Sequence, residues 1–264
     1  MGDCPIVSGR VVRMNLIEKE LELAKETEMF VLIPGTELVE LSRRNVAKVE
    51  AIIQNDSSYI KSSDKKAGPD GKNYGGSTAY WMVQFSQVLS LAESSAGGYA
   101  HVLREVVNAV DRDNSTHLNA DGVGREEMWD RLLKIPKQTL VQYLKFPKES
   151  NYRIIQELSL ATHPKSTKYK PRENLSFASK FCHYACFYLF ESENEQDNFS
   201  IFDAVVKKVL PRYCEHFHVP KLIPSNTDYS KYQQTIDEII NVSGSQISRN
   251  GFDHLLWYYF KGRI

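Results

Sequence analysis

Two neighbouring stretches of the chain carry most of the information about its fold. Residues 175–190 read LSFASKFCHYACFYLF, and residues 198–213 read NFSIFDAVVKKVLPRY. The first stretch is apolar on nearly every side, which is typical of a helix buried at the centre of a helical protein, and it predicts a helix over residues 176–191. The second contains Asp203, a residue type preferred at helix N-caps, and predicts a helix over residues 203–216.

Most of the chain beyond its first 35 residues has the same periodicity. Apolar residues recur at the three- and four-residue spacing of an amphipathic helix. Further helices are expected at residues 37–54, 78–95, 99–110, 125–134, 137–146, 152–161, 229–241 and 245–260. Strands and helices do not alternate, which argues against a doubly wound fold. The sequence therefore predicts a mainly α protein, an irregular bundle of about ten helices.

The beginning of the chain differs from the rest. VSGRVVRMN and MFVLIPG have the composition of short strands, with a helix-like run between them. We expect a small N-terminal segment with short strands at residues 1–35, and a helical domain at residues 36–264 whose core lies at residues 165–218. The polar runs at residues 56–77 and 111–124 indicate exposed loops, because neither has the residue order of a P-loop or an EF-hand.

Composition limits the classes of partner. Lys+Arg and Asp+Glu both number 33, so the formal net charge is zero, whereas dedicated nucleic-acid binders usually carry a basic excess. The charge is uneven along the chain, because residues 165–172 contain Lys165, Lys168, Lys170 and Arg172 and no acidic residue. A basic stripe is therefore compatible with a neutral protein.

The cysteines and the apolar runs indicate the compartment. The four cysteines have no metal-ligand spacing and suggest no disulfide framework. No apolar run reaches the roughly 18 residues that a membrane span needs, and the first residues lack an apolar signal segment. We expect a monomeric cytoplasmic protein, or a nuclear one in a eukaryote, without a bound metal.

The two quoted stretches together resemble the core of the helix-hairpin-helix DNA glycosylases. Residues 178–180, Ala-Ser-Lys, stand where that family has the Gly-x-Lys that ends its hairpin, and FCHYACFYLF supplies the apolar helix that follows. Residues 199–203, FSIFD, resemble the family's Val-Pro-Val-Asp. The sequence is also similar to bacterial and phage-borne relatives of the 8-oxoguanine glycosylases. It departs from the family at residues 171–177, which contain no glycine where the family's hairpin has Leu-Pro-Gly-Val-Gly.

The resemblance implies an all-helical glycosylase fold and a DNA glycosylase, with AP-lyase activity in addition if the amine forms a Schiff base. It gives Lys180 the role of the amine nucleophile, because a primary amine can displace a base from the sugar and remain attached to it. To attack at neutral pH the amine must lose its proton, which burial at the start of a helix favours. The resemblance makes Asp203 the carboxylate that stabilises the positive charge of the breaking glycosidic bond. The implied partner is double-stranded DNA with a damaged or modified base, and no cofactor is implied.

Other residues near this pair are candidates for binding DNA. Phosphate contacts are expected from residues in or beside the hairpin, namely Lys168, Lys170, Arg172 and Ser179. A glycosylase must also hold the extruded base between apolar or aromatic groups. The candidates for that pocket are His183, Trp257 and Phe260.

Each of these residues also has a plainer interpretation. Asp203 is a normal N-cap, and Lys180 at a helix start can extend its amine to the surface. His183 and the aromatic residues have the spacing of core residues. Besides the enzyme, two hypotheses therefore remain open: a catalytically inactive protein of glycosylase fold that binds DNA or a protein partner, and a helical interaction protein whose likeness to glycosylases is coincidental.

Overall fold

The fold was examined in a computed structural model that describes residues 30–55, 78–91, 96–114, 116–118, 124–162, 173–220, 228–261 and 263. These residues contain eleven helices and no strand, apart from one isolated β-bridge between Leu32 and Val39. The helices are α2 (Arg43–Asn55), α4 (Thr78–Ser90), α5 (Ala96–Asn114), α6 (Gly124–Leu133), α7 (Lys137–Lys145), α8 (Arg153–Ser159), α9 (Leu175–Leu189), α10 (Glu193–Gln196), α11 (Ala204–His216), α12 (Tyr229–Val242) and α13 (Arg249–Phe260). The prediction of a mainly α protein is confirmed.

Helix α9 is central because its sequence is apolar almost all round. Helices α4, α5, α7, α8 and α10 all pack against it. Phe177, Phe181, Cys182 and Cys186 of α9 have no exposed surface. A helix with neighbours on so many sides leaves little surface to the solvent, which explains the long uncharged run in its sequence.

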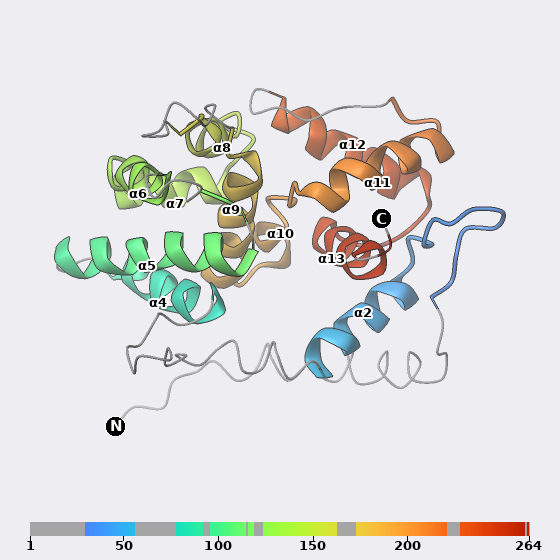
Figure 1. Ribbon diagram of the computed structural model, residues 1–264, viewed down its shortest axis with the longest axis horizontal. Helices are drawn as coiled ribbons and strands as arrows, with labels where there is room; N and C mark the ends of the chain where they lie inside the picture. The colour runs from blue at the N-terminus through green and yellow to red at the C-terminus, as the bar shows by residue number, and fades with distance from the viewer. Residues whose placement is uncertain are drawn as a thin grey trace.

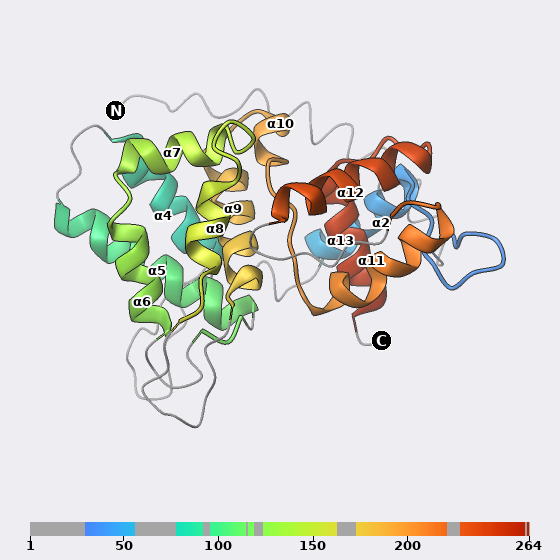
Figure 2. The same ribbon diagram turned by 90° about the horizontal axis from the view of Figure 1, so that it is seen from above.

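The helices form two groups, which we name after their central members. The α9 lobe contains α4–α10, and the α13 lobe contains α2, α11, α12 and α13. The most extensive helix contacts lie within these groups, such as α4 on α5, α8 on α9, and α13 on both α11 and α2. Figures 1 and 2 show the two groups side by side, with α10 near the passage from one to the other. The chain therefore begins and ends its described part in the same lobe.

The largest difference from the predicted boundaries lies before α2. A helix was expected from residue 37, but α2 begins at Arg43. Gly35 has a φ of +73°, which turns the chain back on itself, and Ile33 N donates to Leu38 O at 2.8 Å across the turn. The pairing takes residues 38–41 out of the helix, because their backbone groups are used across the turn instead. Of the two expected strands, VSGRVVRMN lies outside the described residues. MFVLIPG falls almost entirely within them and was wrongly expected as a strand, because its described part forms only the single bridge from Leu32 to Val39.

Other boundaries differ by a few residues. Helix α4 ends at Ser90, five residues before its predicted end, and α5 ends at Asn114, four residues after its predicted end. Helix α13 begins at Arg249, four residues after its predicted start, and α10 was not predicted at all. The residues of α10, ENEQ, lie in an acidic run between the two stretches quoted at the beginning, and four residues are too few to show a periodicity.

Two other expectations concern membranes and thiols. No helix in the described ranges combines the length and the apolar character needed to cross a bilayer. Cys182, Cys186 and Cys214 are buried free thiols.

Candidate active site

Lys180 lies in the second turn of α9, with its side chain buried against the end of α5. The residue is only 8% exposed, and its Nζ donates to the main-chain oxygen of Asn114, the last residue of α5, at 3.0 Å. The amine was expected at a helix start, where the positive end of the helix dipole disfavours the ammonium form. The amine instead contacts the carbonyl end of another helix, whose partial negative charge favours the ammonium form, while burial lowers its pKa as expected.

Asn114 is held by contacts from two other helices. Its Nδ2 donates to Thr78 Oγ1 at 3.3 Å and to Val110 O at 3.1 Å, and its Oδ1 accepts from the hydroxyl of Tyr184 at 2.9 Å. The carbonyl that receives the Lys180 amine therefore belongs to a residue fixed by α4 and α9. Sequence reasoning missed Asn114 because the predicted helix ended at Val110.

Asp203 is the N-cap of α11. Its Oδ1 accepts from the main-chain nitrogens of Val205 at 2.9 Å and Val206 at 3.0 Å. The plainer interpretation of this residue is therefore confirmed. The cap uses Oδ1 for both bonds, so it does not require the second carboxylate oxygen.

The charges of Asp203 and Lys261 both act on Lys180. Burial lowers the pKa of the Lys180 amine, the negative charge of Asp203 raises it, and the positive charge of Lys261 lowers it again. The net shift is downward, so burial outweighs the carboxylate. Lys261 is the C-cap of α13, and its Nζ lies 3.7 Å from the centroid of the Trp257 ring. Groups from α9, the start of α11 and the end of α13 therefore determine the electrostatics of one amine.

The segment that leads to Asp203 is irregular, and side chains satisfy its backbone. Gln233 Nε2 donates to Asn198 O at 3.2 Å, His183 Nδ1 lies 3.1 Å from Phe199 O, and Tyr229 donates to Ser200 O at 2.5 Å. Buried main-chain groups outside helices and sheets need partners of this kind.

The next two residues are held in the same way. Ile201 N donates to Asp253 Oδ2 at 2.7 Å, and Ile201 O accepts from Tyr232 at 2.6 Å. Phe202 N donates to Ser179 Oγ at 3.0 Å. Side chains of α9, α12 and α13 thus hold the main chain of the five residues before Asp203 in place through hydrogen bonds.

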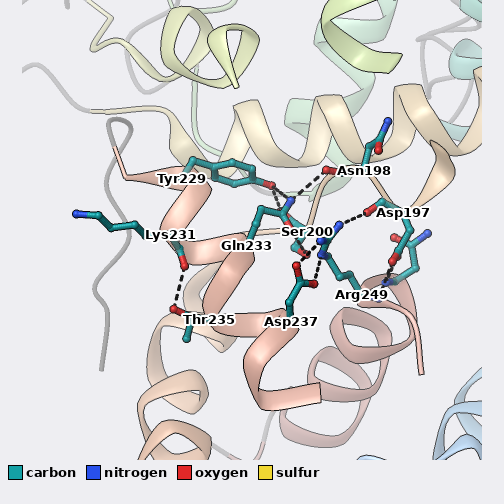
Figure 3. A network of polar contacts seen from close by, with 10 residues as sticks. Asp197, Asn198, Ser200, Tyr229, Lys231, Gln233, Thr235, Asp237 and Arg249 are labelled. Carbon is teal, nitrogen blue, oxygen red and sulfur yellow. Dashed lines mark hydrogen bonds and ion pairs between the residues drawn. The ribbon is translucent and has the colours of Figure 1, made fainter. Parts of the chain in front are cut away.

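A second polar cluster joins α10 to the start of α13. Figure 3 shows Arg249 between Asp197 and Asp237, with Gln233 and Tyr229 beside the irregular segment. Arg249 donates to both oxygens of Asp237, at 2.6 and 2.5 Å, and to Asp197 O at 3.0 Å. The Asp197 carboxylate accepts from the main-chain nitrogens of Arg249 and Asn250 at 3.0 and 2.7 Å. One aspartate after α10 therefore anchors the first turn of α13.

The structure places the expected DNA contacts as follows. Lys168, Lys170 and Arg172 lie outside the described residues. Ser179 has no exposed surface, and its hydroxyl is bonded to both the nitrogen and the oxygen of Phe202. These bonds favour a structural role for Ser179 over contact with a phosphate.

The three candidates for the base pocket have different surroundings. His183 is 2% exposed and its ring holds Phe199 O, while Phe260 is 2% exposed and packs edge-on against Tyr213. Both contacts favour core roles. Trp257 is partly exposed, and the Lys261 amine lies over its ring, so it is the one candidate of the three that keeps exposed surface next to a charge that acts on Lys180.

Two surface hollows lie away from this cluster. One of about 250 Å³ is lined by Lys148, Asn151, Tyr152, Ser230, Gln233, Gln234 and Asp237, and one of about 390 Å³ adjoins it along α8. Neither includes Lys180 or Asp203. In the described part of the chain, no group of three or more His, Cys, Asp or Glu side chains has the arrangement of a metal site.

Comparisons with known proteins found no relative of this chain: no protein-family model, curated protein or solved structure matches it.

Proposed function

We propose that this protein is a DNA glycosylase that removes a damaged or modified base, with Lys180 as the nucleophile and with AP-lyase activity through a Schiff base. One observation carries the proposal: a buried amine with a lowered pKa lies within the electrostatic reach of a carboxylate that opens the following helix. Pairs of titratable groups in perturbed environments are concentrated at functional sites. The resemblance of residues 178–203 to the glycosylase core supports the same assignment.

The chemistry assigned to Lys180 is nucleophilic substitution at the sugar. The neutral amine forms a bond to C1′ while the bond from C1′ to the base breaks, and the base leaves with the electron pair and takes up a proton. Loss of a proton from nitrogen and opening of the sugar ring then give the Schiff base. Removal of a proton from C2′ expels the 3′ phosphate by β-elimination, which cuts the strand.

Two features of the Lys180 environment suit this role. Burial lowers the pKa of the amine, which increases the fraction of the nucleophilic neutral form at a given pH. The bond to Asn114 O fixes the direction of the side chain, and a neutral amine can still donate it.

Asp203 is assigned the stabilisation of developing positive charge. As the glycosidic bond breaks, C1′ and the ring oxygen become electron-poor, and a fixed carboxylate nearby lowers the energy of that state. The cap at the start of α11 holds Asp203 through Oδ1, so the carboxylate is oriented before any substrate binds. Capping and catalysis are compatible in one residue.

A second candidate is a protein of the same fold that binds DNA or a protein partner without catalysis. The contact that favours it is the hydrogen bond from Lys180 to the carbonyl end of α5, because this environment stabilises the ammonium form, which is not nucleophilic. The zero net charge fits a protein partner better than a long stretch of DNA.

Covalent trapping tests the proposal. The protein is incubated with duplexes that contain 8-oxoguanine, uracil or an abasic site, and borohydride is added to reduce any Schiff base to a stable amine. We expect an adduct with the wild-type protein that is absent from Lys180→Gln. The matched control is Lys137→Gln, because Lys137 also donates to the end of a helix, with Nζ 3.3 Å from Val88 O, and should leave trapping unchanged.

Each outcome has a definite meaning. Equal trapping by Lys180→Gln and wild type excludes Lys180 as the nucleophile. Salt-dependent binding to the duplexes without base release or an adduct supports the non-catalytic protein, and the absence of both activities leaves a helical interaction protein.

A further inference from the structure

The peptide groups of Ile201 are held from two sides by buried polar side chains. Its N–H donates to Asp253 Oδ2 of α13 at 2.7 Å, and its carbonyl accepts from the hydroxyl of Tyr232 of α12 at 2.6 Å. Asp253 is 3% exposed and Tyr232 is fully buried. Such bonds have well-defined geometry and are costly to break in a low dielectric, so the two peptide planes on either side of Ile201 are fixed.

Ile201 lies two residues before Asp203. Because consecutive Cα atoms are about 3.8 Å apart, a fixed peptide at Ile201 leaves few free torsions before the carboxylate. Phe202, the residue between them, is bonded through both its nitrogen and its oxygen to Ser179 Oγ. Ser179 directly precedes Lys180 in α9, so the two candidate groups are connected by a short chain of hydrogen bonds and covalent bonds.

Asp253 is an unusual choice for its position if its role is packing alone. Its Oδ1 is buried and has no hydrogen-bond partner among the described residues, an arrangement that reduces stability. Burial raises the pKa of its carboxyl well above the usual range, and the negative charges of Asp197 and Asp203 act in the same direction, while the Ile201 N–H lowers it. A side chain that costs stability in a well-packed core indicates a functional constraint.

We propose that Asp253 and Tyr232 are positioning residues. By hydrogen-bonding to the main-chain N–H and C=O of Ile201, they hold the Asp203 carboxylate in place relative to the Lys180 amine. This inference rests on the proposed glycosylase function. It gives α12 and α13 a part in the reaction although neither residue contacts the DNA. Glycosidic-bond cleavage needs the carboxylate to be placed within a fraction of an ångström. Loss of a hydrogen bond to Ile201 therefore lowers the rate of base release more than the affinity for DNA.

The chain offers a matched pair of substitutions for the test. Tyr232→Phe removes the hydroxyl that bonds Ile201 O, and Tyr213→Phe removes a hydroxyl that bonds Val39 O at the same distance, 2.6 Å. Both tyrosines are fully buried and both acceptors are main-chain carbonyls. The two variants therefore lose the same kind of bond, but only one loses it next to Asp203.

Single-turnover base release is measured at saturating enzyme, together with the dissociation constant for the duplex. We expect Tyr232→Phe to slow base release about tenfold or more while the dissociation constant stays within about twofold, because an interaction that acts in the transition state alters the rate and not ground-state binding. Tyr213→Phe should leave both quantities near wild type. Equal rates for the two variants would overturn the proposal.

Asp253 is tested by two substitutions that differ in hydrogen bonding. Asp253→Asn keeps an oxygen that can accept from Ile201 N, whereas Asp253→Leu has the same branched shape, a larger volume and no acceptor. We expect base release to be retained in the first and lost in the second. In the Asp203→Asn background, Asp253→Leu should cause no further loss, because residues that act through one group are not additive. A further loss there would assign Asp253 a general structural role and contradict the proposal.

A measurement that does not depend on catalysis separates this inference from the proposed function. The main-chain amides of Val205 and Val206 donate to Asp203, so their hydrogen exchange reports where that carboxylate is held. Exchange at these amides should accelerate in Tyr232→Phe and not in Tyr213→Phe. If the wild-type protein releases no base and forms no adduct, the glycosylase proposal fails, and so does the catalytic role assigned to Asp253 and Tyr232. If exchange is unchanged in Tyr232→Phe, the proposal that Tyr232 positions Asp203 is wrong.

Discussion

The amine of Lys180, in the second turn of α9, donates a 3.0 Å hydrogen bond to the main-chain oxygen of Asn114 at the end of α5. Burial and the positive charge of Lys261 lower the pKa of the amine, whereas the negative charge of Asp203 raises it. The net effect is a lowered pKa, so the balance is set by opposing contributions of known origin. Substitutions that remove one contribution at a time can therefore be predicted.

Substitutions of Asp203 distinguish its role as the N-cap of α11 from the effect of its negative charge on Lys180. Asn caps helices about as well as Asp, whereas Ala does not, so we expect Asp203→Asn to retain stability and Asp203→Ala to lose about 1 kcal/mol in urea denaturation. Both variants remove the negative charge that raises the Lys180 pKa, and we expect that pKa to fall further in each. Titration of the lysine Cε resonance by NMR measures this. A Lys180 resonance that titrates as in wild type would contradict the electrostatic link.

Stability should decrease as the pH is lowered from neutral toward 4. Burial, together with the positive charge of His254, lowers the pKa of His183 to about 4, and burial lowers the pKa of His254 to about 4 as well. The unfolded chain binds protons at these rings near pH 6.5, which the folded protein binds only near pH 4. The stabilisation is therefore complete above about pH 6.5 and is lost below it, by up to roughly 3 kcal/mol for a fully buried ring.

Urea denaturation at pH 7 and pH 5 measures this dependence. His254→Gln should reduce the difference between the two pH values, because it removes one of the two rings. The raised pKa of the Asp253 carboxyl acts in the opposite direction, since it favours the folded state at low pH. An unchanged pH dependence in His254→Gln would exclude the ring pair as its source.

The two hydrogen bonds from the Arg249 guanidinium to the Asp237 carboxylate should contribute measurably to stability. Arg249 is 15% exposed and its guanidinium also holds Asp197 O. We expect Arg249→Met to lower the free energy of unfolding by about 2 kcal/mol, and Arg249→Lys to recover only part of it, because an ammonium group cannot make the two parallel bonds. Arg153→Met is the control, since the pair of Arg153 with Glu157 is largely exposed and should not affect unfolding. Equal effects in both variants would contradict this account.

Gly124, at the start of α6, should tolerate no side chain. A Cβ at this position would lie 1.7 Å from the main-chain oxygen of Leu118, so the backbone has to move. We expect Gly124→Ala to cost about 3 kcal/mol in urea denaturation, the range for strained or overpacked sites. Gly35→Ala is the comparison: its φ of +73° is strained for alanine but space is open around it, so a loss of about 1 kcal/mol is expected. A smaller loss for Gly124→Ala than for Gly35→Ala would be inconsistent with the clash.

The sequence was sufficient to predict ten of the eleven helices in the described residues, because the spacing of apolar residues in a packed helix reflects which of its sides are buried. The uncharged run of α9 indicated a central helix, and Asp203 indicated the start of α11. The turn at Gly35 was missed because residues 38–41 have apolar spacing that fits either a helix or an extended pair. Short α10 was missed for the opposite reason, since it has no periodicity to detect.

The site was predictable only in part. Lys180 and Asp203 could be named from sequence because each belongs to a local pattern. The acceptor of the Lys180 amine, Asn114, could not, because it is 66 residues away and its role depends on packing. Asp253 did carry a signal: a carboxylate within the apolar pattern of the last helix, next to Phe252 and before Leu255, falls on its buried face.

The pairing of α2 with α13 has a consequence for synthesis of the chain. Val46 of α2 packs above Gly251 of α13, so the first described helix is completed by the last one. The intervening α9 lobe is continuous in sequence and can fold as it leaves the ribosome, whereas the apolar face of α2 must wait until α13 has been translated. Nascent chains that stall before Arg249 therefore present an unprotected α2, a surface that chaperones bind and proteases cut.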